Sequence, residues 1–372
     1  MTESAIPGHL QQERILPAKT PQDYRPPFPA YTTRFPENVA DLVMAVLGTQ
    51  FPSRSDETSR AIAKLSSFVT SEDADISARP RFHEVASVRD ASGYHNEAVL
   101  AYWSSTAAYK RWAAESGFQQ WWDGLDPEQE PHGWFAEIFF PTMDRAETVF
   151  TSNEIPEGAA HMREGFSGAI IEHGYWGSTR DRLPIAQIDR LDGDKAVWEA
   201  KSEEQEGKPV NAKRRIRVPG TPNLVVIRSG QDWADTYPAE RELYLNEMHP
   251  VLVKGMDFLR DSGHEVGCYS CRLMDVVDAN TGKAGLDRTF GLAYFDELAS
   301  MERWSKEHPT HLAIFGGFLR YVKKLKNNIT LRLFHEVLVL NPEQQLFEYV
   351  GCHPATGMLT AVNGHPGLSK IR

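Results

Sequence analysis

The stretch "LAYFDELASMERW", residues 292–304, repeats an earlier part of the chain. The earlier stretch, "LAYWSSTAAYKRW" at residues 100–112, is identical to it at six of the thirteen aligned positions. In both stretches an apolar run typical of a strand leads into a segment whose apolar residues have helical spacing. A repeat of this kind predicts that the chain folds as two copies of one unit.

Weaker similarities flank this repeat on both sides. "VMAVLGTQ" (43–50) aligns with "LVVIRSGQ" (224–231), and "WFAEIFF" (134–140) aligns with "LRLFHEV" (331–337). Each half then contains a strand, a helix, two strands, a second helix and a last strand, which is the ferredoxin-like order. We therefore expect an α+β fold in which two tandem ferredoxin-like repeats pack their sheets face to face around a shared core, as in a dimeric α+β barrel.

The expected helices span residues 56–70, 105–121, 238–261 and 297–325.

Composition divides the chain into four parts. Residues 1–37 are rich in proline and predict an extended arm, which packs on its own domain or on a partner subunit. The first repeat is expected at 38–189 and the second at 218–372. Residues 190–217 are charged and have no clear period, which predicts a linker loop on the surface.

The overall composition excludes several classes of protein. Apolar residues make up 41% of the 372 residues, so the chain can bury a large core. The net charge of -11 argues against a nucleic-acid partner, because phosphates require clustered basic residues. No apolar stretch is long enough to cross a membrane. The opening "MTESAIPGHLQQER" lacks the features of a secretory signal, so a cytoplasmic location is expected.

The pair Cys268 and Cys271 is open to two interpretations. A "CYSC" spacing is compatible with a redox couple or half of a zinc site. However, "EVGCYSCRLMDVV" has the pattern of a strand, in which residues three apart point to opposite faces. No second pair of ligands completes a zinc site. We therefore favour two structural cysteines.

His311 lies where an apolar side chain is expected. In the helical segment after "HPTH", His311, Ile314, Phe315 and Phe318 share one face. A histidine on such a face is more often a hydrogen-bonded core residue than a ligand. Here the face is aromatic, and the glycine pair at 316–317 would let a flat group approach the helix. This combination is compatible with a haem that has His311 as its axial ligand.

His335 is the second histidine with apolar neighbours. Strand alternation in "TLRLFHEVLVL" places it on the same face as Leu331 and Leu333. A buried structural histidine is the ordinary interpretation. Two inward histidines on consecutive elements can also flank a cavity, where one binds a metal and the other transfers a proton.

Three further residues are weaker candidates. Arg182 ends "EHGYWGSTRDR", which is equally compatible with a solvated surface turn. Ser229 ends an apolar strand but has no GxSxG motif around it, so it does not indicate a serine hydrolase. Glu147 lies in the strand-like run "AETVF", where a carboxylate is more often exposed than functional.

Five short motifs follow one another along the chain: "EHGYWGSTRDR", "IRSGQDW", "HPTH", "LFHEV" and "CHPATGML". Together they resemble the motifs of the aldoxime dehydratase family, and the opening "MTESAIPGHL" and "RPPFPAY" resemble that family's N-terminal arm. The resemblance covers nearly the whole chain. It implies a homodimeric haem protein with one b-type haem that converts aldoximes, R–CH=N–OH, to nitriles and water.

The resemblance also implies roles for individual residues. His311 would be the proximal iron ligand and His335 the distal catalytic residue. Ser229 would hydrogen-bond the oxime hydroxyl, and Arg182 and Glu147 would be supporting polar groups. The substrate, aliphatic or arylaliphatic, stays open.

The chemistry of dehydration is compatible with these roles. Hydroxide is a poor leaving group, so the oxime oxygen must be protonated as the N–O bond breaks. Ferrous haem iron can bind the oxime nitrogen and donate electron density into that bond. His335, as imidazolium, would donate the proton and then take the C–H proton. One histidine can serve both steps when its pKa lies near the working pH, which Glu147 would raise and Arg182 would lower.

Other functions remain open, because a fold does not fix a function. The first alternative is a haem enzyme of the peroxidase or chlorite dismutase type. The second is a non-catalytic haem carrier or sensor, and the third is a protein of this fold without a cofactor.

Overall fold

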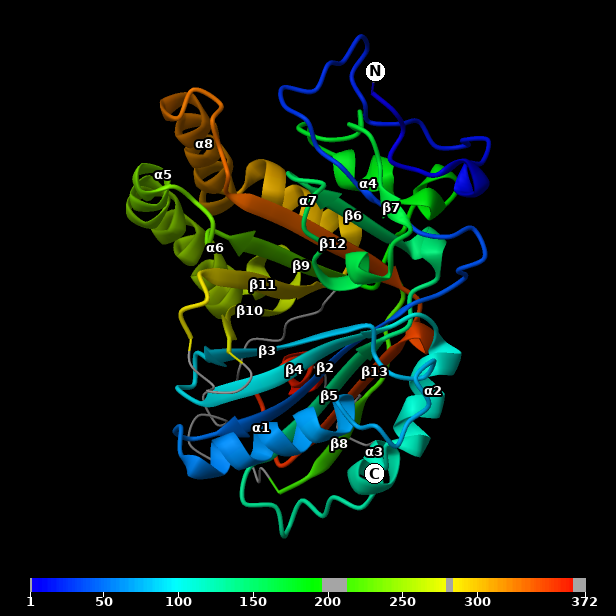
Figure 1. The fold of residues 1–372 in the computed structure, drawn as a ribbon, viewed down its shortest axis with the longest axis vertical. Coiled ribbons are helices and arrows are strands. Elements are labelled where there is room, and N and C mark those ends of the chain that lie inside the picture. Colours follow the sequence, from blue (N-terminus) through cyan, green and yellow to red (C-terminus); the bar gives the residue numbers. More distant parts are fainter. Residues whose placement is uncertain (1, 196–212, 279–283, 364–372) are drawn as a thin grey trace.

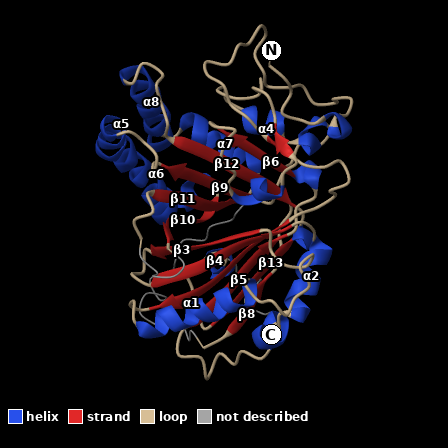
Figure 2. Cartoon of the chain, in the orientation of Figure 1, coloured by secondary structure: helices blue, strands red, loops and turns tan. Residues whose placement is uncertain are grey.

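A single antiparallel sheet of eleven strands forms the body of the molecule (Figures 1 and 2). The computed structural model describes residues 2–195, 213–278 and 284–363. The strands are β1 (Thr33–Arg34), β2 (Val43–Phe51), β3 (Phe82–Arg89), β4 (His95–Trp103), β5 (Gly133–Phe139), β6 (Ala146–Phe150), β7 (Gly165–Phe166), β8 (Arg215–Val218), β9 (Leu224–Asp232), β10 (Cys268–Val277), β11 (Arg288–Phe295), β12 (Arg332–Leu340) and β13 (Gln345–Val350).

The main helices are α1 (Asp56–Val69), α2 (Thr106–Glu115), α3 (Phe118–Asp123), α4 (Ser178–Arg182), α5 (Pro238–Leu243), α6 (His249–Ser262), α7 (Leu298–Glu307), α8 (Pro309–Lys324) and α9 (Leu359–Asn363). A π-helical turn, η6 (Tyr244–Met248), joins α5 to α6.

The order of strands across the sheet is the same in both halves of the chain. The sheet runs β6-β12-β9-β11-β10-β3-β4-β2-β5-β13-β8, with β1 and β7 paired separately. The groups β5-β2-β4-β3 and β12-β9-β11-β10 both follow the order fourth, first, third, second along the chain. We expected two separate sheets, and this was wrong, because β10 pairs with β3 and makes one continuous curled sheet.

Each half also donates one edge strand to the other. Strand β6 follows β5 along the chain but pairs with β12 of the second half. Strand β13 follows β12 but pairs with β5 of the first half. The exchange links the two halves, and it carries Glu147 from the first half to the strand that holds His335.

Three hydrophobic layers follow from this arrangement. Inside the curl, both halves contribute to a shared core. The outer face of the first half is covered by α1, α2 and α3, and the outer face of the second half by α6 and α7 (Figure 1). Helix α8 packs mainly on α6, α7 and η6.

Two glycines show which strand positions of the two halves correspond. A Cβ at Gly48 would lie 2.0 Å from the ring of Phe135, and one at Gly230 would lie 1.9 Å from the ring of Phe334. Each glycine therefore makes room for a cross-strand phenylalanine. Gly48 thus corresponds to Gly230 and not to Ser229, so the two weaker sequence alignments were displaced by one or more residues.

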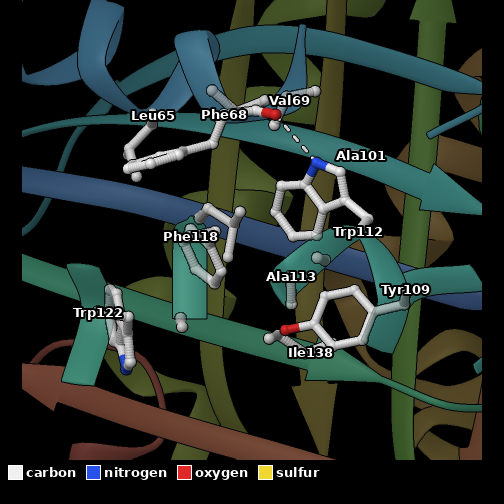
Figure 3. Close-up of a cluster of buried hydrophobic side chains, with 14 of the residues drawn as sticks. Leu65, Phe68, Val69, Ala101, Tyr109, Trp112, Ala113, Phe118, Trp122 and Ile138 are labelled. Carbon is white, nitrogen blue, oxygen red and sulfur yellow. Dashed lines mark hydrogen bonds between the residues drawn. The ribbon is translucent and has the colours of Figure 1, made fainter. Parts of the chain in front are cut away.

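In the first half the outer face is filled by aromatic side chains. Trp112, Phe118 and Trp122 pack between the sheet and the helices, and Trp112 donates a 2.9 Å hydrogen bond to the Phe68 carbonyl (Figure 3). Ala136 of β5, the counterpart of His335, belongs to this core. The corresponding face of the second half keeps a cavity.

Each second helix is divided in two, where one continuous helix was expected. Gly117 lies between α2 and α3 with a φ of 76°, which favours glycine. Pro309 begins α8 directly after α7 and His308, since proline disfavours a helical conformation for the residue before it. The other predicted helices are confirmed, with η6 inside the segment expected at 238–261.

The N-terminal arm lies along its own chain, near α4 (Figure 1). The backbone amides of Lys19 and Thr20 donate to the Asp181 carboxylate, and the amide of Ala5 donates to Glu172. Most of the predicted linker, residues 196–212, lies outside the described residues. Its last residues, 215–217, were expected in a loop but belong to β8, which pairs with β13. None of the helices in the described ranges is long and apolar enough to cross a membrane.

Candidate active site

His335 and Ser229 face each other across two neighbouring strands. They are register partners on β12 and β9. Partners in an antiparallel pair share one face, with Cβ atoms about 4.5–5.5 Å apart. The row continues with Val149 on β6 and Gly291 on β11. Gly291 has no side chain, and an added Cβ there would lie 2.8 Å from the Met256 sulfur, so this glycine lets Met256 pack on the strand beside Ser229.

Helix α8 presents His311 opposite this row. The helix begins with Pro309, and His308 caps it by accepting a hydrogen bond from the Thr310 amide. The ring of His308 also stacks on Phe258, with centroids 3.9 Å apart. His308 is therefore occupied as a cap, whereas His311 lies one turn further and lines the cavity.

The cavity between α8 and the sheet has a volume of about 730 Å³. This lies within the usual range of roughly 300–1,000 Å³ for sites that enclose a small molecule or cofactor. Its apolar wall is made by Phe28, Met248, Met256, Phe295, Met301, Trp304, Ile314, Phe315, Phe318 and Leu333. Its polar side chains include His173, Thr179, Arg182, Ser229, Gln231, His311 and His335.

Both facing histidines are neutral at ordinary pH. Burial lowers the pKa of His311 to about 4. The nearby backbone of Ser305 raises this pKa slightly, although its geometry is not that of an ordinary hydrogen bond to Nδ1. Burial, then the charge of Arg182, then His311 lower the pKa of His335 to about 4. A neutral imidazole is the form that binds a metal.

Arg182 and Glu147 form a buried pair beside the cavity. Arg182 Nε lies 2.6 Å from Glu147 Oε2, and Arg182 Nη2 lies 2.9 Å from Oε1. Arg182 Nη1 donates to the Glu172 carbonyl at 2.9 Å, and Nη2 also donates to Thr179 at 3.2 Å. Burial raises the pKa of Glu147, and Arg182 opposes this shift. Only Arg182 of the pair lines the cavity, with Glu147 behind it.

The structure thus places four of the five predicted residues on the cavity wall. The fifth, Glu147, lies behind the wall and pairs with Arg182. Sequence analysis missed His173, Phe28, Tyr244 and Trp304, which also line the cavity. His173 lies inside a motif that had been noted for its arginines. Phe28 belongs to the arm, where proline spacing gave no indication of a contact with the core.

Gly317 of the α8 glycine pair has a packing role, and neither glycine is among the residues that line the cavity, where a flat group was expected to approach. A Cβ at Gly317 would lie 3.2 Å from the Met248 sulfur, so this glycine lets α8 approach η6. The wall toward the cavity is made by Ile314, Phe315 and Phe318.

The cysteines are structural, but the expected geometry was wrong. A β-bulge between Cys268 and Ser270 shifts the register of β10, so Cys268 pairs with Phe295 and Cys271 with Ala293. Both cysteines therefore face the same hydrophobic cluster. Both are free and buried, and burial raises the pKa of each thiol.

The donor set of the cavity fits a haem. Two neutral imidazoles lie on opposite walls, and the wall beside His311 is apolar and aromatic. Within the described residues, no cluster of three or more His, Cys, Asp or Glu side chains can hold a bare metal ion. A metal that depends on one protein ligand must bring its other ligands with it, as a porphyrin does.

Comparisons with known proteins agree with this geometry. A family model described as haem-containing dehydratase matches residues 45–358. An aliphatic aldoxime dehydratase of Pseudomonas chlororaphis is 39% identical over 96% of this chain and 97% of its own. A phenylacetaldoxime dehydratase of Bacillus sp. (strain OxB-1) is 30% identical over 91% of this chain and 93% of its own.

A solved structure is similar along nearly the whole chain. The crystal structure of an aldoxime dehydratase in complex with butyraldoxime has a TM-score of 0.85 and 38% sequence identity. The match covers 96% of this chain and 96% of that one.

Proposed function

The chain belongs to the family of haem-containing dehydratases, and from this we propose that it converts aldoximes to nitriles and water in the cavity between His311 and His335. The observation that supports this most strongly is the pairing of Ser229 with His335 on the wall opposite His311. A hydroxyl and an imidazole side by side suit a substrate that loses a hydroxyl group and a proton.

His311 would hold the haem iron from the side of α8, as the proximal ligand. When bound, the haem supplies a ferrous iron that accepts the oxime nitrogen and donates electron density into the N–O bond. The apolar wall around His311 keeps water away from this side.

Ser229 and His335 act on the oxime hydroxyl group. Ser229 Oγ, which lines the cavity, would hydrogen-bond the oxime oxygen and orient it toward His335. His335 would donate a proton to that oxygen and then accept the C–H proton, which restores its starting state. With a pKa of about 4, only a small imidazolium fraction is present at pH 7, so we propose that this fraction is the reactive one.

Arg182 and Glu147 would support the site without transferring a proton. Arg182 lowers the pKa of His335, and Glu147 compensates the arginine charge through two hydrogen bonds. Glu147 therefore limits how far the charge of Arg182 disfavours the imidazolium of His335.

We also propose that the halves, 38–189 and 218–372, are tandem ferredoxin-like repeats preceded by the arm at 1–37. The common strand order of the two halves supports this. The linker at 190–217, the b-type haem, the homodimer and the cytoplasmic location stay predictions.

Turnover assays separate the proposal from its alternatives. The reduced, haem-loaded protein should form nitrile from butyraldoxime or phenylacetaldoxime and show little turnover of hydrogen peroxide. Peroxide turnover without nitrile would indicate a peroxidase-like enzyme. Rapid haem transfer to apomyoglobin without either activity would indicate a carrier, and purified protein that binds no added haem would indicate a fold without a cofactor.

A further inference from the structure

His173 is a buried histidine with no hydrogen-bond partner at either ring nitrogen within the described residues. It is 3% exposed and lines the cavity. The ring packs on Phe28 of the arm, with centroids 5.2 Å apart, and the backbone carbonyl accepts a 2.6 Å hydrogen bond from the Tyr24 hydroxyl. The backbone is therefore anchored, while the polar atoms of the side chain are unused.

An unsatisfied buried polar group costs about 1–3 kcal/mol, so a ligand that satisfies it gains a corresponding advantage. Burial, then Arg182, lower the pKa of His173 to about 4, so the ring is neutral and has one donor and one acceptor nitrogen. The ligand that suits this ring is a group that both donates and accepts.

The charge nearest to His173 favours a neutral ligand. The positive charge of neighbouring Arg182 is already compensated by Glu147 through two hydrogen bonds. A carboxylate beside His173 would have to compete with Glu147 for Arg182, whereas a small neutral molecule would not. The other cations of the cavity wall are Lys19 and Lys306.

Arg182 has one N–H left for such a molecule. A guanidinium has five N–H donors. Four hydrogen bonds from Arg182 go to Glu147, Glu172 and Thr179. A water molecule could accept a hydrogen bond from the fifth N–H of Arg182 and donate one to the acceptor nitrogen of His173. These are two hydrogen bonds, the minimum that a buried water molecule requires.

We propose that His173 and the remaining N–H of Arg182 form a subsite that receives the water molecule released in each turnover. This rests on the proposed function, in which the oxime oxygen leaves as water beside Ser229 and His335. His335, Arg182 and His173 all line the same cavity, so the released water can reach His173 without leaving it. His173 is thus a positioning residue for the product and not an acid or a base.

The test is His173→Phe, which keeps an aromatic ring against Phe28 and removes both nitrogens. His132→Phe is the matched control, because among the described residues His132 also has no hydrogen-bond partner at either ring nitrogen, and its ring stacks on Phe51 with centroids 4.1 Å apart. His132 is not among the residues that line the cavity. His173→Gln, which restores a donor and an acceptor, is the rescue variant.

In the haem-loaded wild-type crystal structure we expect an ordered water within hydrogen-bond distance of a His173 ring nitrogen and Arg182. His173→Phe should lack it and should lower kcat for an aldoxime about 5- to 150-fold with little change in KM. His173→Gln should recover most of kcat, and His132→Phe should keep it.

Two results would overturn the subsite: a His173 nitrogen bonded to a haem carboxylate or to another protein group, or His173→Phe with wild-type kcat. If His173→Phe does not fold, the wild-type crystal structure and the kcat of His173→Gln still test the subsite. Wild-type protein that forms no nitrile would contradict the proposed function instead, and a water bound to His173 and Arg182 would then be a resident water and not a product.

Discussion

His308 and His311 lie three residues apart but have different roles, because their contacts differ. His308 accepts the Thr310 amide as the cap of α8, and its ring stacks on Phe258. His311 lines the cavity, and its buried Nδ1 has no ordinary hydrogen bond to any described residue. The "HPTH" motif alone does not distinguish them, but the helical face does.

This contrast predicts the outcome of two alanine substitutions. His311→Ala should lose most of the haem, because it removes the proposed ligand. His308→Ala should keep the haem and lose about 0.5–2 kcal/mol of stability through the missing cap. Haem per chain, from the Soret absorbance of purified protein, measures the difference. Full occupancy in His311→Ala would exclude His311 as the ligand.

The depressed pKa of His335 predicts how the rate depends on pH. Above a pKa of about 4, the imidazolium fraction falls tenfold for each pH unit. If the imidazolium donates the proton, kcat/KM should rise about tenfold per unit as the pH is lowered from 8 to 5. The Soret band at each pH controls for haem loss through His311. A rate that is constant over this range would mean that the neutral ring is the reactive form.

Helical and strand periodicity placed His311 and His335 on apolar faces, and both side chains line the cavity. Ser229 was noted only as the end of an apolar strand, and its role came from the family resemblance. Phe28 and His173 were missed because an arm and a loop have no periodicity from which a face can be assigned. Gly317 was misinterpreted because close approach of a neighbouring helix and of a ligand leave the same sequence pattern.

Strand β6 is the element that supports the site from the other half of the chain. It pairs with β12 and carries Glu147 to Arg182. The sequence predicted the strand but not its exchange, because the pairing of an edge strand depends on tertiary contacts. The β10 bulge was missed for the same reason, since the inserted residue changes a register that only the partner strand reveals.

The buried pair on β6 predicts a large effect for Glu147→Gln. The substitution leaves Arg182 without its compensating charge, which typically costs about 3–5 kcal/mol. Glu247→Gln is the control, because its contact with Lys324 is exposed and such pairs contribute about 0–1 kcal/mol. Urea unfolding of the haem-loaded proteins measures both. Equal, small losses would mean that the Arg182–Glu147 pair does not stabilise β6.

The whole molecule has two similar halves and a cavity on the outer face of the second. Aromatic residues fill the corresponding face of the first half, including Trp112, which aligns with Trp304 of the cavity wall (Figure 3). The sequence repeat led us to expect two halves, with which the common strand order is compatible. It did not predict which face would stay open, because this depends on the packing of many side chains.

The haem chemistry of the whole protein predicts a dependence on redox state. Donation of electron density into the N–O bond requires ferrous iron, so dithionite-reduced protein should form nitrile and air-oxidised protein should be much slower. Nitrile formation measured anaerobically for both forms of one preparation provides the test. Equal rates would rule out this role of the iron.

Nitrile formation by His335→Ala, with its Soret band, tests the central claim most directly. The variant should keep a Soret band of wild-type height, because His335 is not the proposed ligand, and should lose about 100- to 10,000-fold in nitrile formation. Ser229→Ala should lose less, about 5- to 150-fold, if it orients the hydroxyl through one hydrogen bond. A His335→Ala protein with near wild-type nitrile formation, or one that has lost its haem, would contradict the account.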